Sequence, residues 1–285
     1  MTIQADAVAM LTAMGFEASQ ATEALTICGG NVEQAANYLL TGGVVSQGNA
    51  NNARRAESDH SSSESRMVHS SMSQYTVNQG KSACTCMSLV AAEKFLRNSN
   101  TTDPVQAVSS ELLQDIVTSG VAAYQRLQSS SAGSSVAHLS AEEVLVAGAF
   151  PELSLQGGIR QGMLSHDDAN NPQGLLQQLT DCRSATGWTC VLITKTPETV
   201  LVCVPPSSAS TAADASSTEH FLLLDSHPRP QQFGAEGSYA RIHDSMPGLV
   251  QSLSSIFPIT DLGPDIPEMM AIMYNSFDLY PLQLQ

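Results

Sequence analysis

Two cysteines, Cys84 and Cys86, stand at the start of an apolar stretch with helical spacing, in the run QGKSACTCMSLVAAEKFL of residues 79–96. A thiol reacts as the thiolate, which is favoured at a helix N-terminus and beside a protonated histidine. A polar loop that contains Gly80 leads directly into the predicted helix, so a cysteine in its first turn has the first of these settings. The stretch therefore indicates a candidate nucleophile.

Other roles for this pair of cysteines lack partners in the chain. A zinc site needs four ligands, commonly from two CxxC pairs, and the C-x-C spacing here has no second cluster to match it. The run HDD at residues 166–168 offers a ligand fragment, but it is more simply a solvated loop. Six cysteines in 285 residues are too few for a disulfide scaffold. We therefore expect no metal and no other cofactor.

Cys84 is the preferred nucleophile of the two. Ser88 and Leu89 follow it in the register C-x-x-x-S-L, which recurs after the nucleophile of many papain-like cysteine proteases. On the same helix Cys86 would point about 200° away, where it is expected to behave as a small buried hydrophobe. Gln79, upstream of the helix, can offer an amide N–H at the position where an oxyanion would develop.

His227 is the favoured general base among the seven histidines. It lies in LLLDSHPRP, where an extended backbone would point the side chains of Asp225 and His227 the same way. The carboxylate can accept a hydrogen bond from the imidazole, fix its tautomer and raise its basicity. Pro228 ends the strand and leaves His227 at its rim.

Two other assignments of the base and its partner stay open. In papain-type enzymes the partner follows the histidine on the next strand, and Asp244 has a suitable spacing from His227, although it is also a natural helix N-cap. His220 opens the run HFLLLD and could be the base instead. Four further histidines lie in polar segments of the sequence: His60, His69, His138 and His166.

The elements that would position these residues come as helices first and strands afterwards. Helices are predicted over residues 84–97 and 109–127 and after the capping box of Ser140 and Glu143. The strands predicted next are a hairpin of residues 188–194 and 199–204 around the turn KTPE, a buried strand over 220–226, and SYARIH. A last helix, in DSMPGLVQSLSSIF, would be capped by Asp244 or Ser245. This order predicts an α+β domain, a helical lobe packed on an antiparallel sheet.

The C-terminal segment PEMMAIMYNSFDLYPLQLQ is apolar enough either to pack against the domain or to bind a partner. Its pattern does not decide between the two.

The first 43 residues predict three short helices. Apolar positions recur with helical spacing in ADAVAMLTAMGF, EASQATEALTIC and NVEQAANYLL, which are separated by Gly15 and by a Gly-Gly turn. The segment resembles a ubiquitin-associated (UBA) domain, with MGF, GGN and YLL at the spacing of that family. The resemblance implies an apolar patch of Met14, Gly15, Phe16 and Leu40 that binds the hydrophobic face of ubiquitin. In such a small bundle Met14 and Phe16 could also close the core.

A Ser- and Asn-rich segment, residues 44–73, is predicted to be a flexible linker between this bundle and a folded domain of residues 74–285. The larger domain resembles the herpesvirus large tegument protein deubiquitinases over residues 79–96 and 187–257, with a cysteine first and an Asp-x-His pair late in the chain. Proteases that process autophagy ubiquitin-like modifiers share the Asp-x-His pair.

Carried over residue by residue, the resemblance makes Cys84 the nucleophile, His227 the base and acid, Asp225 its orienting partner and Gln79 the oxyanion donor. The spacing from Gln79 to Cys84 is shorter than in the viral enzymes, and Asn78 is the alternative. The implied fold is that of a papain-like cysteine protease.

The two resemblances together imply a cysteine-type deubiquitinase. It would hydrolyse isopeptide bonds after the C-terminal glycine of ubiquitin, with ubiquitin and ubiquitinated proteins as its partners. Two other functions stay open: a non-catalytic ubiquitin-binding adaptor, and a protease for a ubiquitin-like modifier.

The bulk composition fits this interpretation. A formal net charge of −15 and a pI of about 4.6 argue against a nucleic-acid binder, which needs clustered Lys and Arg. The same charge suits ubiquitin, whose recognition face and C-terminal tail carry basic residues. No apolar run approaches the roughly 20 residues of a membrane span, and the N-terminus lacks the pattern of a signal peptide. We expect a cytoplasmic protein, with a nuclear location also open.

Overall fold

The computed structural model divides the chain into two compact units, Met1–His60 and Ser61–Gln285. The residues it describes are 7–8, 11–12, 17–27, 35, 66–98, 105–130, 138–166, 168–207, 219–263 and 266–285.

The smaller unit contains helix α2, Ala18–Ile27, together with helical positions on either side of it in the sequence. Its core consists of small or aliphatic side chains at the positions expected from the helical spacing: Ala7, Leu11, Ala21, Ala24, Leu25 and Ala35. The predicted ubiquitin-binding residues Met14, Gly15, Phe16 and Leu40 lie outside the described residues.

The larger unit is built on an eight-stranded sheet with the order β1-β7-β6-β5-β4-β8-β2, in which β3 also pairs with β8. Its strands are β1 (Arg66–His69), β2 (Leu153–Leu155), β3 (Arg160–Met163), β4 (Thr189–Lys195), β5 (Glu198–Val204), β6 (Phe221–Asp225), β7 (Tyr239–His243) and β8 (Ser276–Leu284). All of the strand pairs are antiparallel. The inner strands β4, β5 and β6 are buried on both faces, which explains their nearly continuous apolar sequences.

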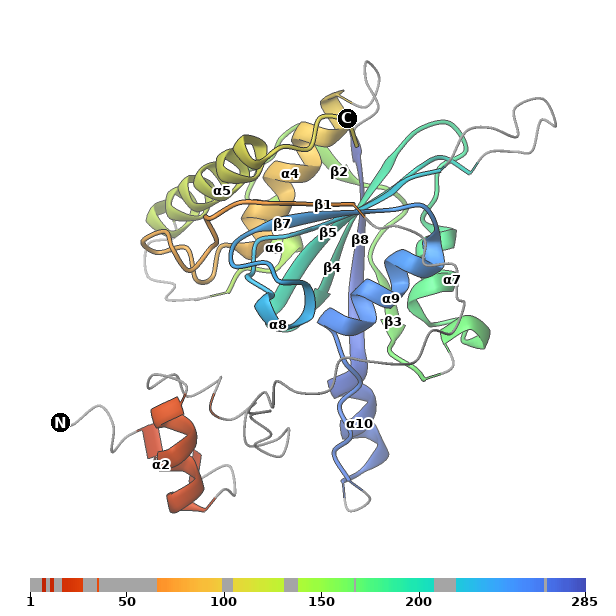
Figure 1. Ribbon diagram of the computed structural model, residues 1–285. Coiled ribbons are helices and arrows are strands. Elements are labelled where there is room, and N and C mark those ends of the chain that lie inside the picture. The colour runs from red at the N-terminus through yellow and green to blue at the C-terminus, as the bar shows by residue number, and fades with distance from the viewer. Residues whose placement is uncertain are drawn as a thin grey trace, which may run out of the picture. The chain divides into compact units, whose positions relative to one another are not determined.

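Helices cover both faces of this sheet (Figure 1). They are α4 (Cys84–Asn98), α5 (Ser110–Ser130), α6 (Ala141–Val146), the 3-10 turn η1 (Asp168–Asn170), α7 (Leu175–Asp181), α8 (Pro230–Phe233), α9 (Met246–Ile256) and α10 (Glu268–Asn275). One core lies between the sheet and the layer of α4, α5 and α6, and a second lies between the sheet and α7 and α9. Helix α10 extends away from the sheet beyond the first residue of β8 (Figure 1).

The predicted helices and strands around the candidate site are confirmed, including the capping box of Ser140 and Glu143 at α6. The N-cap of α9 is Ser245, whose side chain accepts from the Gly248 N–H.

The predicted extent of the linker is wrong at its C-terminal end. Residues 66–69 form β1, which pairs with β7 in the register Arg66 to Ile242, because the half-buried Met67 and Val68 complete that side of the sheet. The C-terminal segment forms α10 and β8, and β8 pairs with β4 inside the sheet. Among the described helices, none is long and apolar enough to cross a membrane.

The close approach of α5 to α4 depends on Gly120. A Cβ atom added there would lie 2.6 Å from the Cα atom of Met87 and 2.8 Å from its backbone nitrogen. We expect Gly120→Ala to lower the free energy of unfolding by about 1–3 kcal/mol, because backbone atoms of α4 must shift and this outweighs the better helix propensity of alanine. Gly187, where an added Cβ would meet nothing within 4 Å, supplies the control Gly187→Ala. Urea unfolding of both variants measures the difference, and equal stabilities would contradict the close-packing argument.

Candidate active site

Cys84 is the first residue of α4, and its side chain is buried against the turn between β4 and β5. The sulfur lies 3.9 Å from the carbonyl oxygen of Pro197 in that turn. The neighbouring Thr85 is joined to Thr199 of β5 through their hydroxyl oxygens, at 3.3 Å. The first turn of α4 is thus fixed to the sheet, with Cys84 at the positive end of the helix dipole and no acidic residue in that turn.

Asp225 and His227 lie side by side at the end of β6, as the two-residue spacing predicts. Nδ1 of His227 lies 2.5 Å from Oδ1 of Asp225, and the His227 backbone N–H donates to the same oxygen at 2.9 Å. Both side chains are buried. Because an ionised carboxylate can only accept, Nδ1 carries the proton and Nε2 is left to hydrogen-bond with Cys84. The structure therefore brings Cys84, His227 and Asp225 together.

The opposite charges of Asp225 and His227 stabilise each other. Burial alone would lower the pKa of His227, but the charge of Asp225, hydrogen bonds to Asp225 and Cys84, and the charge of Glu198 together raise it well above its ordinary value. Burial alone would raise the pKa of Asp225, but the charges of His227 and Arg229 and hydrogen bonds from His227 lower it to about 2. The imidazole of His227 is therefore favoured in its protonated form, beside the ionised carboxylate of Asp225. A protonated histidine of this kind stabilises a neighbouring thiolate.

The second oxygen of Asp225 is held by two residues that sequence reasoning missed. Arg229 Nε donates to Oδ2 at 2.9 Å, and the Tyr239 hydroxyl donates to it at 3.2 Å. Arg229 also donates from Nη2 to Glu198 at 2.6 Å, so one guanidinium connects β6 to the start of β5. Arg229 is four residues after Asp225 in the run DSHPR, but nothing in that pattern shows that the chain turns back onto the carboxylate.

The alternative partners are arranged differently. Asp244 lies 3.0 Å from Nδ1 of His220 rather than beside His227, and both side chains are about one-third exposed. Cys86 is buried in the core between α4 and the sheet. Burial and the nearby Cys84 raise the pKa of the Cys86 thiol to about 12, which disfavours its thiolate.

Gln74, rather than Gln79, contacts the segment that carries Asp225 and His227. Gln79 is exposed in a turn with a positive φ of 62°, and Asn78 beside it is also exposed. The buried Gln74 accepts from the hydroxyl of Ser226, between Asp225 and His227, at 3.0 Å. Its backbone N–H donates to the Ser226 carbonyl at 3.1 Å.

One side-chain N–H of Gln74 donates to the carbonyl of Lys81, at 3.2 Å, which leaves the second N–H of the amide for another acceptor. The longer spacing from Gln74 to Cys84 is the sequence signal that could have identified it, since the spacing from Gln79 is short for the resembled family.

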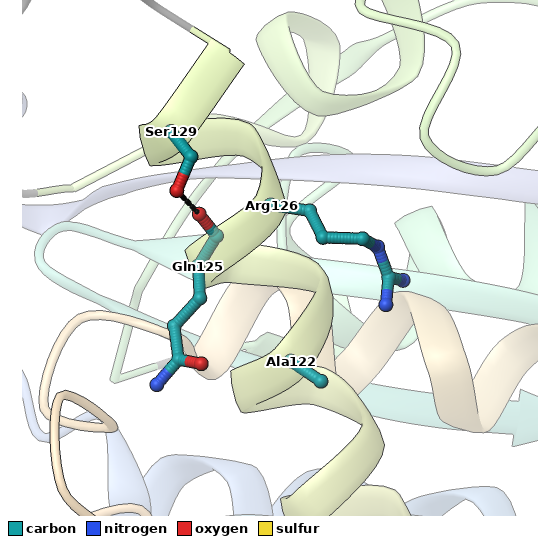
Figure 2. A pocket seen from close by; sticks show the side chains of 4 residues that line it. All are labelled: Ala122, Gln125, Arg126 and Ser129. Atoms are coloured by element: carbon teal, nitrogen blue, oxygen red, sulfur yellow. Dashed lines mark hydrogen bonds between the residues drawn. The ribbon is translucent and has the colours of Figure 1, made fainter.

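A surface depression on α5 is lined by side chains of other kinds than those of this group. It is lined by Ala122, Gln125, Arg126 and Ser129, which all come from one helix (Figure 2), and the Ser129 hydroxyl donates to the Gln125 carbonyl at 2.8 Å. These four residues include no Cys, His, Asp or Glu.

In the part of the chain that the structure describes, no group of three or more His, Cys, Asp or Glu could hold a metal ion. Asp168, in the HDD run considered above as a ligand fragment, accepts from the backbone N–H groups of Leu175 and Leu176 at the start of α7.

Comparison with known proteins adds a family and a fold. Residues 3–39 match the UBA/TS-N domain family. The chain is similar to the ubiquitin-specific protease encoded by the murine cytomegalovirus tegument protein M48, solved with a ubiquitin-based suicide substrate. The two are 13% identical over 77% of this chain and 86% of that chain, with a TM-score of 0.51.

A second match, the Pseudomonas avirulence protein AvrPphB, is 12% identical over 70% of this chain and 91% of that chain, with a TM-score of 0.38. No curated protein matches the sequence. The predicted α+β architecture is confirmed: the chain carries a UBA domain at its N-terminus, and its larger unit shares the fold of the viral ubiquitin-specific protease.

Proposed function

We propose that the protein is a cysteine-type deubiquitinase that hydrolyses isopeptide bonds after the C-terminal glycine of ubiquitin. The observation that carries the proposal is the hydrogen-bonded series of Cys84, His227 and Asp225 at the start of a helix. A nucleophile beside a base that a third group orients is the arrangement that covalent acyl transfer requires.

The reaction has two steps. The Cys84 sulfur attacks the glycine carbonyl while its proton resides on His227, and the negative charge develops on the carbonyl oxygen. His227 then gives that proton to the departing lysine amine as the C–N bond breaks and a thioester forms. In the second step His227 takes a proton from water, the resulting hydroxide adds to the thioester carbonyl, and the thiolate leaves.

Gln74 is the proposed side-chain donor to the developing oxyanion. Loss of one such donor costs about 10²–10³-fold in kcat, so we expect a decrease of that size in Gln74→Ala. The variant Gln79→Ala is the matched control and is expected to keep its kcat, because that side chain is exposed. Steady-state hydrolysis of a ubiquitin C-terminal fluorogenic amide measures both. A large loss in Gln79→Ala with none in Gln74→Ala would return the role to Gln79.

Ubiquitin as the substrate is supported by the UBA domain of residues 3–39. The proposed contacts of that domain are Met14, Gly15, Phe16 and Leu40, which would present an apolar patch to ubiquitin. Because both activities belong to one chain, ubiquitin held by the UBA domain would be concentrated near the site. The net charge of −15 adds attraction for the basic recognition face of ubiquitin.

The test uses the full chain with two reagents, a ubiquitin C-terminal fluorogenic amide and a ubiquitin probe with a C-terminal electrophile. We expect hydrolysis of the amide and a covalent adduct at Cys84. Parallel probes built on ubiquitin-like modifiers show which modifier is preferred. If no cysteine reacts with any probe while the chain still binds ubiquitin, the protein is a ubiquitin-binding adaptor and the proposal fails.

A further inference from the structure

Helix α10 extends from the same end of the sheet at which Cys84, His227 and Asp225 lie. In β8, Asp278 pairs with Thr194 of β4, one residue before the last residue of that strand. The hydroxyl of Thr194 lies 2.9 Å from that of Thr199, which in turn contacts Thr85 in the first turn of α4. The first residues of β8 therefore lie level with the nucleophile, and α10 continues outward from them (Figure 1).

The base of the α10 segment is fixed by Asn275. Its side-chain oxygen accepts from the Thr260 N–H at 2.8 Å, and its amide donates to the carbonyls of Thr260 and Ala271 at 3.0 Å each. The Asn275 carbonyl also accepts from the Leu164 N–H at 2.9 Å. These hydrogen bonds join the residues before α10 to the residue that ends it. Helix α10 therefore extends from the domain at a point that the buried Asn275 fixes.

Five of the eight side chains of α10 are large, apolar and exposed, and they cover more than half of the helix circumference. The exposed fraction is 67% for Met269, 65% for Met273 and 45% for Tyr274, and Met270 and Ile272 are each 42% exposed. Most of the large exposed apolar side chains in the described part of the chain belong to this one helix. A concentrated apolar surface marks an interaction site, and methionine side chains adapt readily to a partner.

The charges around α10 specify the partner. Glu268, in the first turn of α10, is exposed and is the one charged side chain of this helix. From Asp261 to the last residue, the printed sequence contains no Lys, Arg or His. An apolar helix whose one charged side chain is acidic suits an apolar patch that is bordered by basic residues, as on the recognition face of ubiquitin.

We propose that α10 binds the globular body of the ubiquitin-type modifier whose C-terminal tail enters the site at Cys84. The inference rests on the proposed function, and it adds a contact that is separate from the UBA domain. Binding energy from α10 would hold the modifier while its tail reaches the nucleophile at the same end of the sheet.

Kinetics with two substrates give the first test. In the full chain, we expect Met269→Ser combined with Met273→Ser to raise KM for a ubiquitin C-terminal fluorogenic amide about tenfold or more and to leave kcat within about twofold. Hydrolysis of a short peptide amide with the same C-terminal residues should not change, because it lacks the globular body. Val146→Ser is the control, since Val146 is 82% exposed on α6 in the layer of α4 and α5. An unchanged KM for the ubiquitin amide, or equal losses on both substrates, would overturn the proposal.

Photo-crosslinking gives a second test that does not need activity. A benzophenone amino acid at position 273 should crosslink to added ubiquitin, and the same group at position 146 should not. If the wild-type chain cleaves neither substrate but position 273 crosslinks, the α10 contact stands and the deubiquitinase proposal falls. If the chain is active but position 273 gives no crosslink, or crosslinks only to a second copy of the chain, the α10 inference falls alone.

Discussion

Cys84→Ala is expected to abolish hydrolysis of a ubiquitin C-terminal amide, lowering kcat by about 10⁴-fold or more, because the thioester cannot form without the sulfur. Cys86→Ala is the matched control two residues away and is expected to keep kcat. The Cys86 side chain packs in the core, and its raised pKa of about 12 keeps the thiol protonated at neutral pH. Initial rates and the mass of the electrophilic-probe adduct measure both effects.

Folding must be checked alongside these rates. Both cysteines are buried, so each alanine variant loses some packing, and thermal unfolding monitored by circular dichroism shows whether the domain is intact. Full activity in Cys84→Ala, with loss of activity in a folded Cys86→Ala, would reassign the nucleophile to Cys86.

Asp225→Asn is expected to lower kcat about 10³–10⁴-fold, because the carboxylate that fixes the His227 tautomer and stabilises its charged form is removed. Asp244→Asn is the control and should keep kcat, since Asp244 contacts His220. A large loss in Asp244→Asn with little change in Asp225→Asn would restore the papain-type assignment of the partner. The measurement is the rate on the fluorogenic amide at several pH values.

The same variant has a pH-dependent effect on stability, with a sign set by the two shifted pKa values. The raised pKa of His227 stabilises the folded state fully below its ordinary value, and this contribution disappears as pH rises through the folded value. The lowered pKa of Asp225 stabilises the folded state above its ordinary value, and this contribution disappears as pH falls toward 2.

Asp225→Asn should therefore lose most stability relative to the wild type between about pH 4 and pH 6.5, and the difference should shrink outside that window. Urea unfolding inside and outside the window measures it. A difference that is the same at every pH would show that the pair contributes no charge-dependent stability.

The elements around the site were predictable because local patterns determine them. The helical spacing after Cys84 marks α4, and the two-residue spacing of Asp225 and His227 at the end of a buried strand predicts their contact. Gln74 and Arg229 were missed because their partners depend on where the chain turns after β6 and before α4.

The strands β1 and β8 were missed for a related reason. Val68 and Met67 lie in a Ser-rich segment, and their partial burial depends on pairing with β7, far along the chain. In β8, the run FDLYPL alternates weakly and contains Pro281, which is unusual inside a sheet. Both strands form because they pair with segments far away in the chain, and short-range sequence patterns do not show that pairing.

The sheet joins segments that are distant in the chain, since Arg66 pairs with Ile242 and Leu153 pairs with Leu284. Closing such long loops carries an entropy cost before the new contacts form, and topologies of this kind fold slowly. The contacts between α4 and α5 are local and can form early, whereas Asp225 meets Tyr239 only when β6 has paired with β7. During refolding, the helices would thus form before the site, and recovery of catalysis would mark the completion of the sheet.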